Sequence, residues 1–90
     1  MNSKIILNNK KIIENNFNKG KFEKVIKLGK KFLKINKDFQ VLYALGLTYL
    51  TLKNYLEAEK FFRNIILFKP NAENYYIYGN IHKQLKNYNE

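Results

Sequence analysis

Hydrophobic residues recur at intervals of three and four along almost the whole chain, which is the period of an α-helix. Five such stretches are separable, at about residues 3–17, 21–35, 39–52, 55–68 and 72–86. In the second stretch Val25 and Phe32 fall on a broad apolar face, and lysines occupy the opposite side. No segment keeps the two-residue period of a strand for long. The pattern therefore predicts an all-α chain of about five helices.

Turn and capping residues separate these stretches. Gly20 marks the end of the first stretch, and Pro70 ends the fourth because its ring disfavours helical geometry at the preceding residue. The predicted N-cap residues are Ser3, Asp38, Asn54, Asn71 and Asn87. Glu57 follows Asn54 at the spacing of a capping box, and Glu90 follows Asn87 in the same way. The connections are therefore predicted to be tight turns, with a sixth helix beginning at the end of the sequence.

Similar residues recur 33 positions apart, which indicates stacked helical repeats. Phe22, Tyr55 and Tyr88 are spaced in this way, and so are Gly46 and Gly79. No linker or low-complexity tail divides the chain. We therefore predict one domain over residues 1–90, with repeats at about 5–38 and 39–71 and a truncated copy at 72–90.

The middle repeat carries the fullest signature. Its key residues are Leu42, Leu45, Gly46, Tyr49, Ala58, Phe62 and Pro70. They match the pattern W-x2-L-G-x2-Y, then A-x3-F, then P, with Leu42 in the place of the tryptophan. The chain thus resembles the tetratricopeptide repeat family, whose unit is a helix-turn-helix of about 34 residues.

The flanking copies depart from this signature. In the third copy its places hold Tyr75, Tyr78, Gly79 and His82. The first copy fits in its second half, through Gly20, Phe22, Val25 and Phe32. Ile13 replaces its first-helix glycine, and Gly29 stands where a phenylalanine is usual. The resemblance therefore covers about two and a half units.

The resemblance implies antiparallel helix-turn-helix repeats stacked as a short right-handed α-solenoid. Small residues at Gly46 and Ala58 would let the two helices of the middle unit approach closely. Ankyrin repeats share the period, but their T-P-L-H-x-A signature is absent. An ordinary helical bundle without superhelical stacking is the remaining alternative.

In the resembled family the first helix of each unit lines a concave groove that receives a peptide or a helix. Mapped onto this chain, the groove positions are Lys10, Glu14, Phe17, Tyr43, Ala44, Leu47, Leu50, Tyr76, Ile77 and Asn80. The alternative for Leu47 and Leu50 is packing within or between repeats. The resemblance implies a protein-protein interaction module or scaffold, with another protein as its partner.

Some relatives grip the C-terminal carboxylate of heat-shock chaperones with lysine, asparagine and arginine side chains. The aligned places in this chain hold Lys10, Glu14, Ala44, Glu73 and Ile77, so only Lys10 fits. Glu14 and Glu73 would repel a carboxylate. This type of clamp is therefore predicted to be absent.

The net charge of +10 raises an alternative function, binding to nucleic acid or to an anionic membrane surface. Lysine supplies all but one of the 17 basic residues, a bias that an AT-rich genome also produces. The lysines of the second helix form one stripe: Lys24, Lys27, Lys31 and Lys34, extended by Lys30 and Lys37. No aromatic residue is interleaved with it, and Arg63 is the only arginine, so a solvated convex face is favoured over nucleic acid binding.

Candidate catalytic chemistry is scarce. His82 is the only histidine and takes a core place of the signature, which predicts a buried or half-buried ring. Without cysteine, a nucleophile or a metal-ligating cluster, neither an enzyme nor a cofactor is expected. The apolar run of residues 5–7 is too short for a signal segment or a membrane span. We therefore expect a cytoplasmic protein.

The last helix raises self-association as a further alternative. No complete hairpin partner follows it in the sequence. Its face with Tyr75, Tyr78 and Leu85 would either pack on the fourth helix and otherwise stay exposed, or be covered by another chain.

Overall fold

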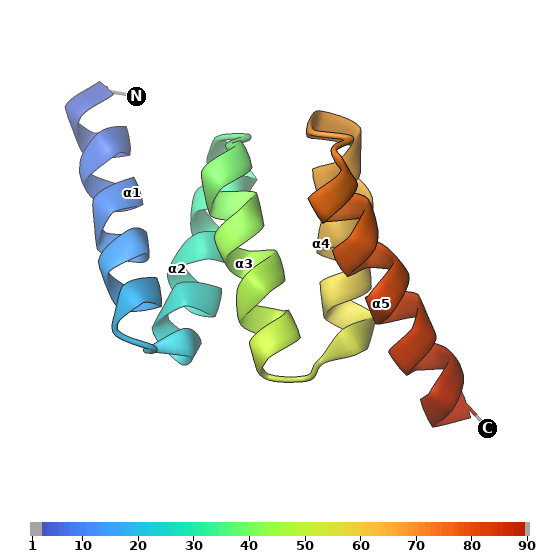
Figure 1. Cartoon of the computed structure of the whole chain (residues 1–90). Coiled ribbons are helices and arrows are strands. Elements are labelled where there is room, and N and C mark those ends of the chain that lie inside the picture. Colours follow the sequence, from blue (N-terminus) through green and yellow to red (C-terminus); the bar gives the residue numbers. More distant parts are fainter. Residues whose placement is uncertain (1–2, 90) are drawn as a thin grey trace.

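The computed structural model describes residues 3–89, and side-chain surroundings over residues 3–87 (Figure 1). Within this range it contains five α-helices and no strand. They are α1 (Ser3–Asn18), α2 (Phe22–Ile35), α3 (Phe39–Thr51), α4 (Tyr55–Phe68) and α5 (Ala72–Asn89). The predicted all-α class and the first four helix ranges are confirmed to within one residue at each end.

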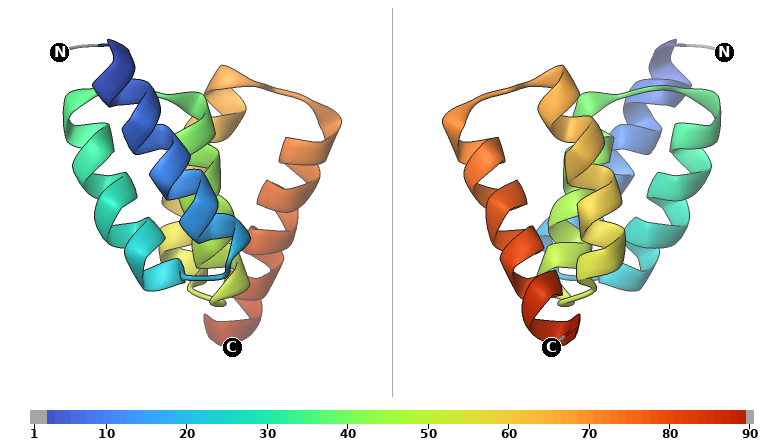
Figure 2. Two further views of the ribbon diagram at one scale, coloured as in Figure 1. Left: turned by 90° about the vertical axis from the view of Figure 1, so that its left-hand side faces the viewer. Right: turned by 90° about the vertical axis from the view of Figure 1, so that its right-hand side faces the viewer.

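Consecutive helices run antiparallel and pack on one another, and α1 also contacts α3. In Figure 1, α2 and α4 lie behind α1, α3 and α5. Figure 2 shows the stack from its two ends, with α2 and α5 on opposite sides of the α3–α4 pair. The stack measures 47 × 26 × 20 Å. This arrangement confirms the predicted stack of helical hairpins.

The core is centred on α3, which packs against both α2 and α4. Its buried residues are Val41, Leu45, Gly46, Thr48 and Tyr49. A Cβ atom at Gly46 would lie 2.9 Å from the ring of Phe62, so the missing side chain allows α4 to approach. A Cβ atom at Gly29 would lie 2.9 Å from Leu45. The first repeat thus has glycine in place of the usual aromatic residue because Leu45 fills that space.

Three of the predicted N-caps are confirmed. Asp38 accepts a hydrogen bond from the Val41 amide at 3.1 Å. Asn54 accepts one from the Glu57 amide at 3.4 Å, and Asn71 accepts one from the Asn74 amide at 2.8 Å. Each of these bonds satisfies a backbone donor that the first helical turn leaves without an intrahelical partner.

Two details of the predicted caps are wrong. Ser3 lies inside the first turn of α1 rather than before it. The backbone amide of Asn54 donates to the carbonyl of Tyr49 at 2.9 Å. The Glu57 carboxylate instead accepts from the Lys60 ammonium at 3.5 Å. The turn after α3 includes Lys53 at φ 60°, and it brings the Tyr49 carbonyl to this amide. A backbone acceptor thus takes the role predicted for Glu57.

The predicted end of the last helix is also wrong. Helix α5 continues to Asn89 and passes through Asn87, which was predicted to cap a sixth helix. Residues 85–88 have the same sequence, L-K-N-Y, as residues 52–55, where the chain turns after α3. The turn at residues 52–55 is stabilised because α4 folds back and packs on α3. Within the described range, no following helix packs on α5. Glu90 lies outside the described residues.

The face of α5 that packs on the core overlaps the predicted one only in part, because Tyr78 and Leu85 are half-buried against the core. Asn74 and Ile81 are buried there, whereas Tyr75 and His82 are exposed. His82 was predicted to be at least half-buried, and that prediction is wrong. Its ring lies edge-on to Tyr78, with a centroid distance of 4.6 Å. The reason is tertiary, because Tyr49 in the middle repeat is buried under α4 and α5 has no such cover in the described structure.

Candidate binding groove along the first helices

A first hollow lies between α1 and α3 and has a volume of about 330 Å³. Six of the predicted groove residues line it: Lys10, Glu14, Phe17, Tyr43, Ala44 and Leu47. Sequence reasoning missed four further lining residues, Ile13, Asn18, Gln40 and Val41. Ile13 and Val41 are buried in the core, so they form the floor of the hollow. Their apolar character and helical spacing predicted burial, but no local signal placed them beneath a groove.

A second hollow, of about 370 Å³, lies between α3, the start of α4 and α5. It is lined by Leu50, Tyr55, Ile77, Asn80 and Gln84, of which Leu50, Ile77 and Asn80 were predicted. Tyr76, the remaining predicted groove residue, is 72% exposed and lines neither hollow. The structure thus brings together every predicted groove position except Tyr76, in two hollows that share α3.

Tyr43 packs against two aromatic rings at the edge of the first hollow. Its ring stacks on Phe39 at a centroid distance of 5.6 Å and meets the ring of Phe62 edge-on at 6.0 Å. Burial, with a smaller effect from the charge of Glu73, raises the pKa of Tyr43 above its ordinary value. Tyr43 combines a fixed apolar ring with a hydrogen-bond donor, a combination enriched in binding sites.

An ion pair joins α1 to the start of α3 beside the first hollow. The Lys10 ammonium lies 2.8 Å from the Asp38 carboxylate, and both side chains are largely shielded from solvent. Burial raises the pKa of Asp38, but hydrogen bonds from Lys10 and the Val41 amide outweigh it and hold that pKa below its ordinary value. The one residue that fits the carboxylate clamp is thus already paired within the chain.

The lining of the first hollow carries little net charge although the chain is strongly basic. Lys10 is paired with Asp38, and Glu14 is exposed on the rim. The other polar lining residues, Asn18 and Gln40, are neutral. Among the described residues, no three His, Cys, Asp or Glu side chains are grouped so that they could hold a metal ion. The groove therefore offers apolar contacts with a nearly neutral rim.

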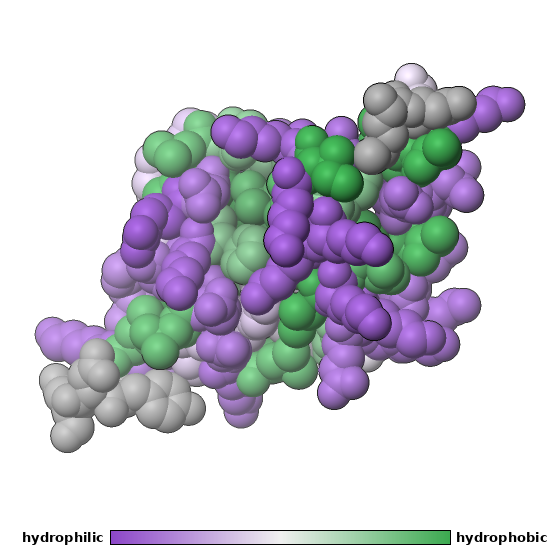
Figure 3. Space-filling view, turned by 180° about the vertical axis from the view of Figure 1, so that it is seen from behind, coloured by the Kyte–Doolittle hydropathy of each residue, from purple (hydrophilic) through white to green (hydrophobic). Residues whose placement is uncertain are grey.

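A stripe of lysines lies on α2, which faces the back of the stack in Figure 1 and lines neither hollow. Figure 3 shows this back face, where hydrophilic side chains cover much of the surface with apolar patches between them. The four lysines of the stripe on α2, Lys24, Lys27, Lys31 and Lys34, are all exposed. Lys30, which extends the stripe, lies 5.4 Å from the ring centroid of Tyr49, and their hydrogen bond raises the pKa of Lys30. Groove and basic face are thus two separate surfaces.

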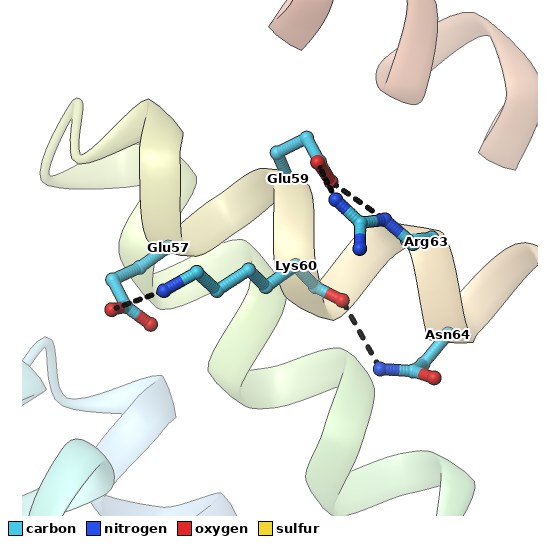
Figure 4. A network of polar contacts seen from close by, with 5 residues as sticks. All are labelled: Glu57, Glu59, Lys60, Arg63 and Asn64. Carbon is cyan, nitrogen blue, oxygen red and sulfur yellow. Dashed lines mark hydrogen bonds and ion pairs between the residues drawn. The ribbon is translucent and has the colours of Figure 1, made fainter.

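Helix α4 carries its own polar network (Figure 4). The guanidinium of Arg63 donates to both carboxylate oxygens of Glu59, with an Nε to Oε2 distance of 3.1 Å. Hydrogen bonds to Glu59 and Tyr78 raise the pKa of Arg63. Lys60 lies beside Glu57, and its carbonyl accepts from the Asn64 amide group at 3.1 Å. The only arginine of the chain is therefore engaged in contacts within the molecule.

Antiparallel helical hairpins stacked in sequence define a helical-repeat protein. Residues 39–71 match the family model of the tetratricopeptide repeat. This segment begins with α3, contains α4 and ends at Asn71, so the match falls on the repeat whose signature is fullest. Comparison with curated proteins and with solved structures gave no significant match.

The tetratricopeptide repeat is a fold used to hold other proteins, which supports the coarse prediction of an interaction module. None of the helices within residues 3–89 is long and apolar enough to cross a membrane.

Proposed function

We propose that the chain is a protein-interaction module that binds an extended or helical peptide segment along α1, α3 and α5. The observation that supports this most directly is the pair of hollows on either side of α3. They gather the groove positions that the family resemblance implied, apart from Tyr76. Volumes of about 330 and 370 Å³ fall within the range of about 300–1,000 Å³ typical of ligand pockets.

The chemistry of the groove defines its ligand. An apolar anchor of the partner contacts Phe17, Ala44 and Leu47 in the first hollow, above a floor of buried aliphatic residues. A carbonyl or other hydrogen-bond acceptor of the partner lies opposite the Tyr43 hydroxyl. A free C-terminal carboxylate is disfavoured, because Lys10 is paired and Glu14 stands on the rim. The expected partner segment is internal, with apolar anchors spaced to reach both hollows.

Peptides selected from a random display library against the full chain provide the test. Binding of a selected peptide is measured by calorimetry with an Ala44→Arg variant, which fills the first hollow without removing a core side chain. Tyr43→Phe removes only the hydroxyl, and Tyr76→Ala is the control at an exposed tyrosine outside the hollows.

We expect Ala44→Arg to weaken binding at least tenfold and Tyr43→Phe to weaken it by a smaller factor. Tyr76→Ala should leave it within about twofold, since surface contacts outside the anchor pocket contribute little. Circular dichroism verifies that each variant is folded. Unchanged affinity in a folded Ala44→Arg variant would refute groove binding.

A further inference from the structure

The lysine stripe of α2 has no acidic partners, unlike the basic residues of α4. Helix α2 contains five lysines and one glutamate, whereas α4 contains two basic and two acidic residues. On α4, Lys60 is paired with Glu57 and Arg63 with Glu59. Within the part of the chain whose side chains are described, no ion pair involves the stripe, which consists of Lys24, Lys27, Lys31 and Lys34. A compositional bias of the whole chain would act on both helices, so it does not explain this contrast.

The stripe lies on a face that the stacking of further repeats leaves open. Its counterparts on α4, 33 positions later, are Glu57, Lys60, Asn64 and Leu67. Helix α4 has a complete helical hairpin stacked before its own and α5 packed after it, yet Lys60, Asn64 and Leu67 are all exposed. A further repeat stacked before α1 would therefore leave the stripe accessible in the same way.

An aliphatic side chain lies at the end of the stripe. Ile35 is 62% exposed and follows Lys31 by one helical turn, so it lies on the same side of α2. Its counterpart on α4, Phe68, is 56% exposed, which shows that stacking leaves this position open as well. The four lysines extend over about 15 Å along the helix axis. A row of ammonium groups beside an exposed aliphatic side chain matches the surface of an anionic bilayer, where charged headgroups lie over acyl chains.

We propose that the lysine stripe and Ile35 dock the chain on an anionic membrane surface, with α2 lying along the headgroups. The ammonium groups pair with the headgroup anions, and Ile35 reaches the boundary of the acyl chains. Nucleic acid fits this surface less well, because α2 has no arginine and no exposed aromatic side chain on which a base could stack. The stripe lines neither hollow of the groove, so this proposal does not depend on peptide binding.

Co-sedimentation of the full chain with lipid vesicles tests the proposal. One set of vesicles is an equimolar mixture of phosphatidylcholine and phosphatidylserine, and the other is phosphatidylcholine alone. Lys27→Gln combined with Lys31→Gln removes two charges from the middle of the stripe. Lys83→Gln combined with Lys86→Gln removes two exposed charges from α5 and gives the same net charge, so it is the matched control.

Two further variants test the aliphatic contact. Ile35→Gln replaces the exposed side chain at the end of the stripe, and Leu67→Gln makes the same kind of change at a site on α4 that is 78% exposed. All the substituted side chains are exposed, so the fold should be retained, and circular dichroism verifies this.

We expect the unmodified chain to bind the anionic vesicles and not those of phosphatidylcholine alone. The double variant of the stripe should bind about 25-fold more weakly, since each lysine near an anionic bilayer strengthens binding about fivefold. The double variant of α5 should stay within about threefold, because α5 lies on the opposite side of the α3–α4 pair and salt screens charges over about 8 Å. Ile35→Gln should weaken binding measurably, and Leu67→Gln should not.

Four results would overturn the proposal. The first is equal binding, or none, to the two sets of vesicles. The second is an equal loss in the two double variants, which would mean that net charge alone drives adsorption. The third is binding that Ile35→Gln leaves unchanged, which would contradict contact with the acyl boundary. The fourth is a labelled oligonucleotide that binds through Lys27 and Lys31 while anionic vesicles do not bind, which would assign the stripe to nucleic acid.

Discussion

Alanine substitution at the two equivalent glycines should change stability in opposite directions. At Gly46 the added methyl group would lie 2.9 Å from Phe62 and 3.0 Å from Ile65. Both of these side chains are fully buried, so neither has space to move aside. At Gly79 the same methyl group points into open space. The two variants carry the same chemical change in the same helical context and differ only in packing.

Two effects set the magnitude. Replacing glycine by alanine inside a helix stabilises by about 0.5–1 kcal/mol. Overpacking a well-filled core costs about 1–3 kcal/mol. Gly79→Ala therefore gains about 0.5–1 kcal/mol, and Gly46→Ala, where overpacking outweighs propensity, loses about 1 kcal/mol. The resulting difference of about 1.5–2 kcal/mol corresponds to roughly 6–16 °C in melting temperature for a domain of this size.

Thermal unfolding followed by far-ultraviolet circular dichroism measures both variants against the unmodified chain. The expected order of melting temperatures is Gly79→Ala, then the unmodified chain, then Gly46→Ala. A Gly46→Ala variant as stable as Gly79→Ala would show that α4 does not pack closely against Gly46. A destabilised Gly79→Ala variant would show that this face of α5 is covered.

Further predictions concern single contacts. Thr48 is fully buried and its hydroxyl has no hydrogen-bond partner among the described residues, so Thr48→Val should raise the free energy of unfolding by about 1 kcal/mol in urea titration. Asp38 has a lowered pKa in the folded chain, so its stabilising contribution is present above its ordinary pKa and is lost as the pH falls through the folded value. The melting temperature of the unmodified chain should therefore fall as the pH is lowered from about 5 to about 3. In Asp38→Asn it should fall less steeply over the same range, and an equal slope in the two proteins would contradict the pairing of Asp38 with Lys10. Charge reversal at Lys27 and Lys31 should leave the affinity for a groove peptide within about twofold at physiological salt, because the basic face is separate from the groove.

Local signals predicted most of the fold. The caps at Asp38 and Asn71 and the stop at Pro70 act within a few residues, so the sequence alone located the helix ends near them. The end of α5 could not be predicted in this way, because L-K-N-Y turns after α3 and stays helical in α5. Packing of a following helix distinguishes the two cases, and packing is not encoded in four residues.

The candidate site shows the same division between local and tertiary information. Helical spacing within a repeat predicted that Tyr43, Ala44 and Leu47 share a face, and these residues line one hollow. The pairing of Lys10 with Asp38 joins two helices that are distant in sequence, and no local pattern reveals it. The exposure of His82 likewise depends on whether a second helix covers α5. Long-range contacts therefore account for what the sequence left undetermined.

The most direct test of groove binding is nuclear magnetic resonance mapping of the ¹⁵N-labelled chain with a display-selected peptide. We predict that the largest amide shift changes occur at residues lining the two hollows, including Phe17, Ala44 and Leu47 of the first and Leu50 of the second. Shift changes concentrated on the lysine stripe of α2, with the hollows unaffected, would contradict the account.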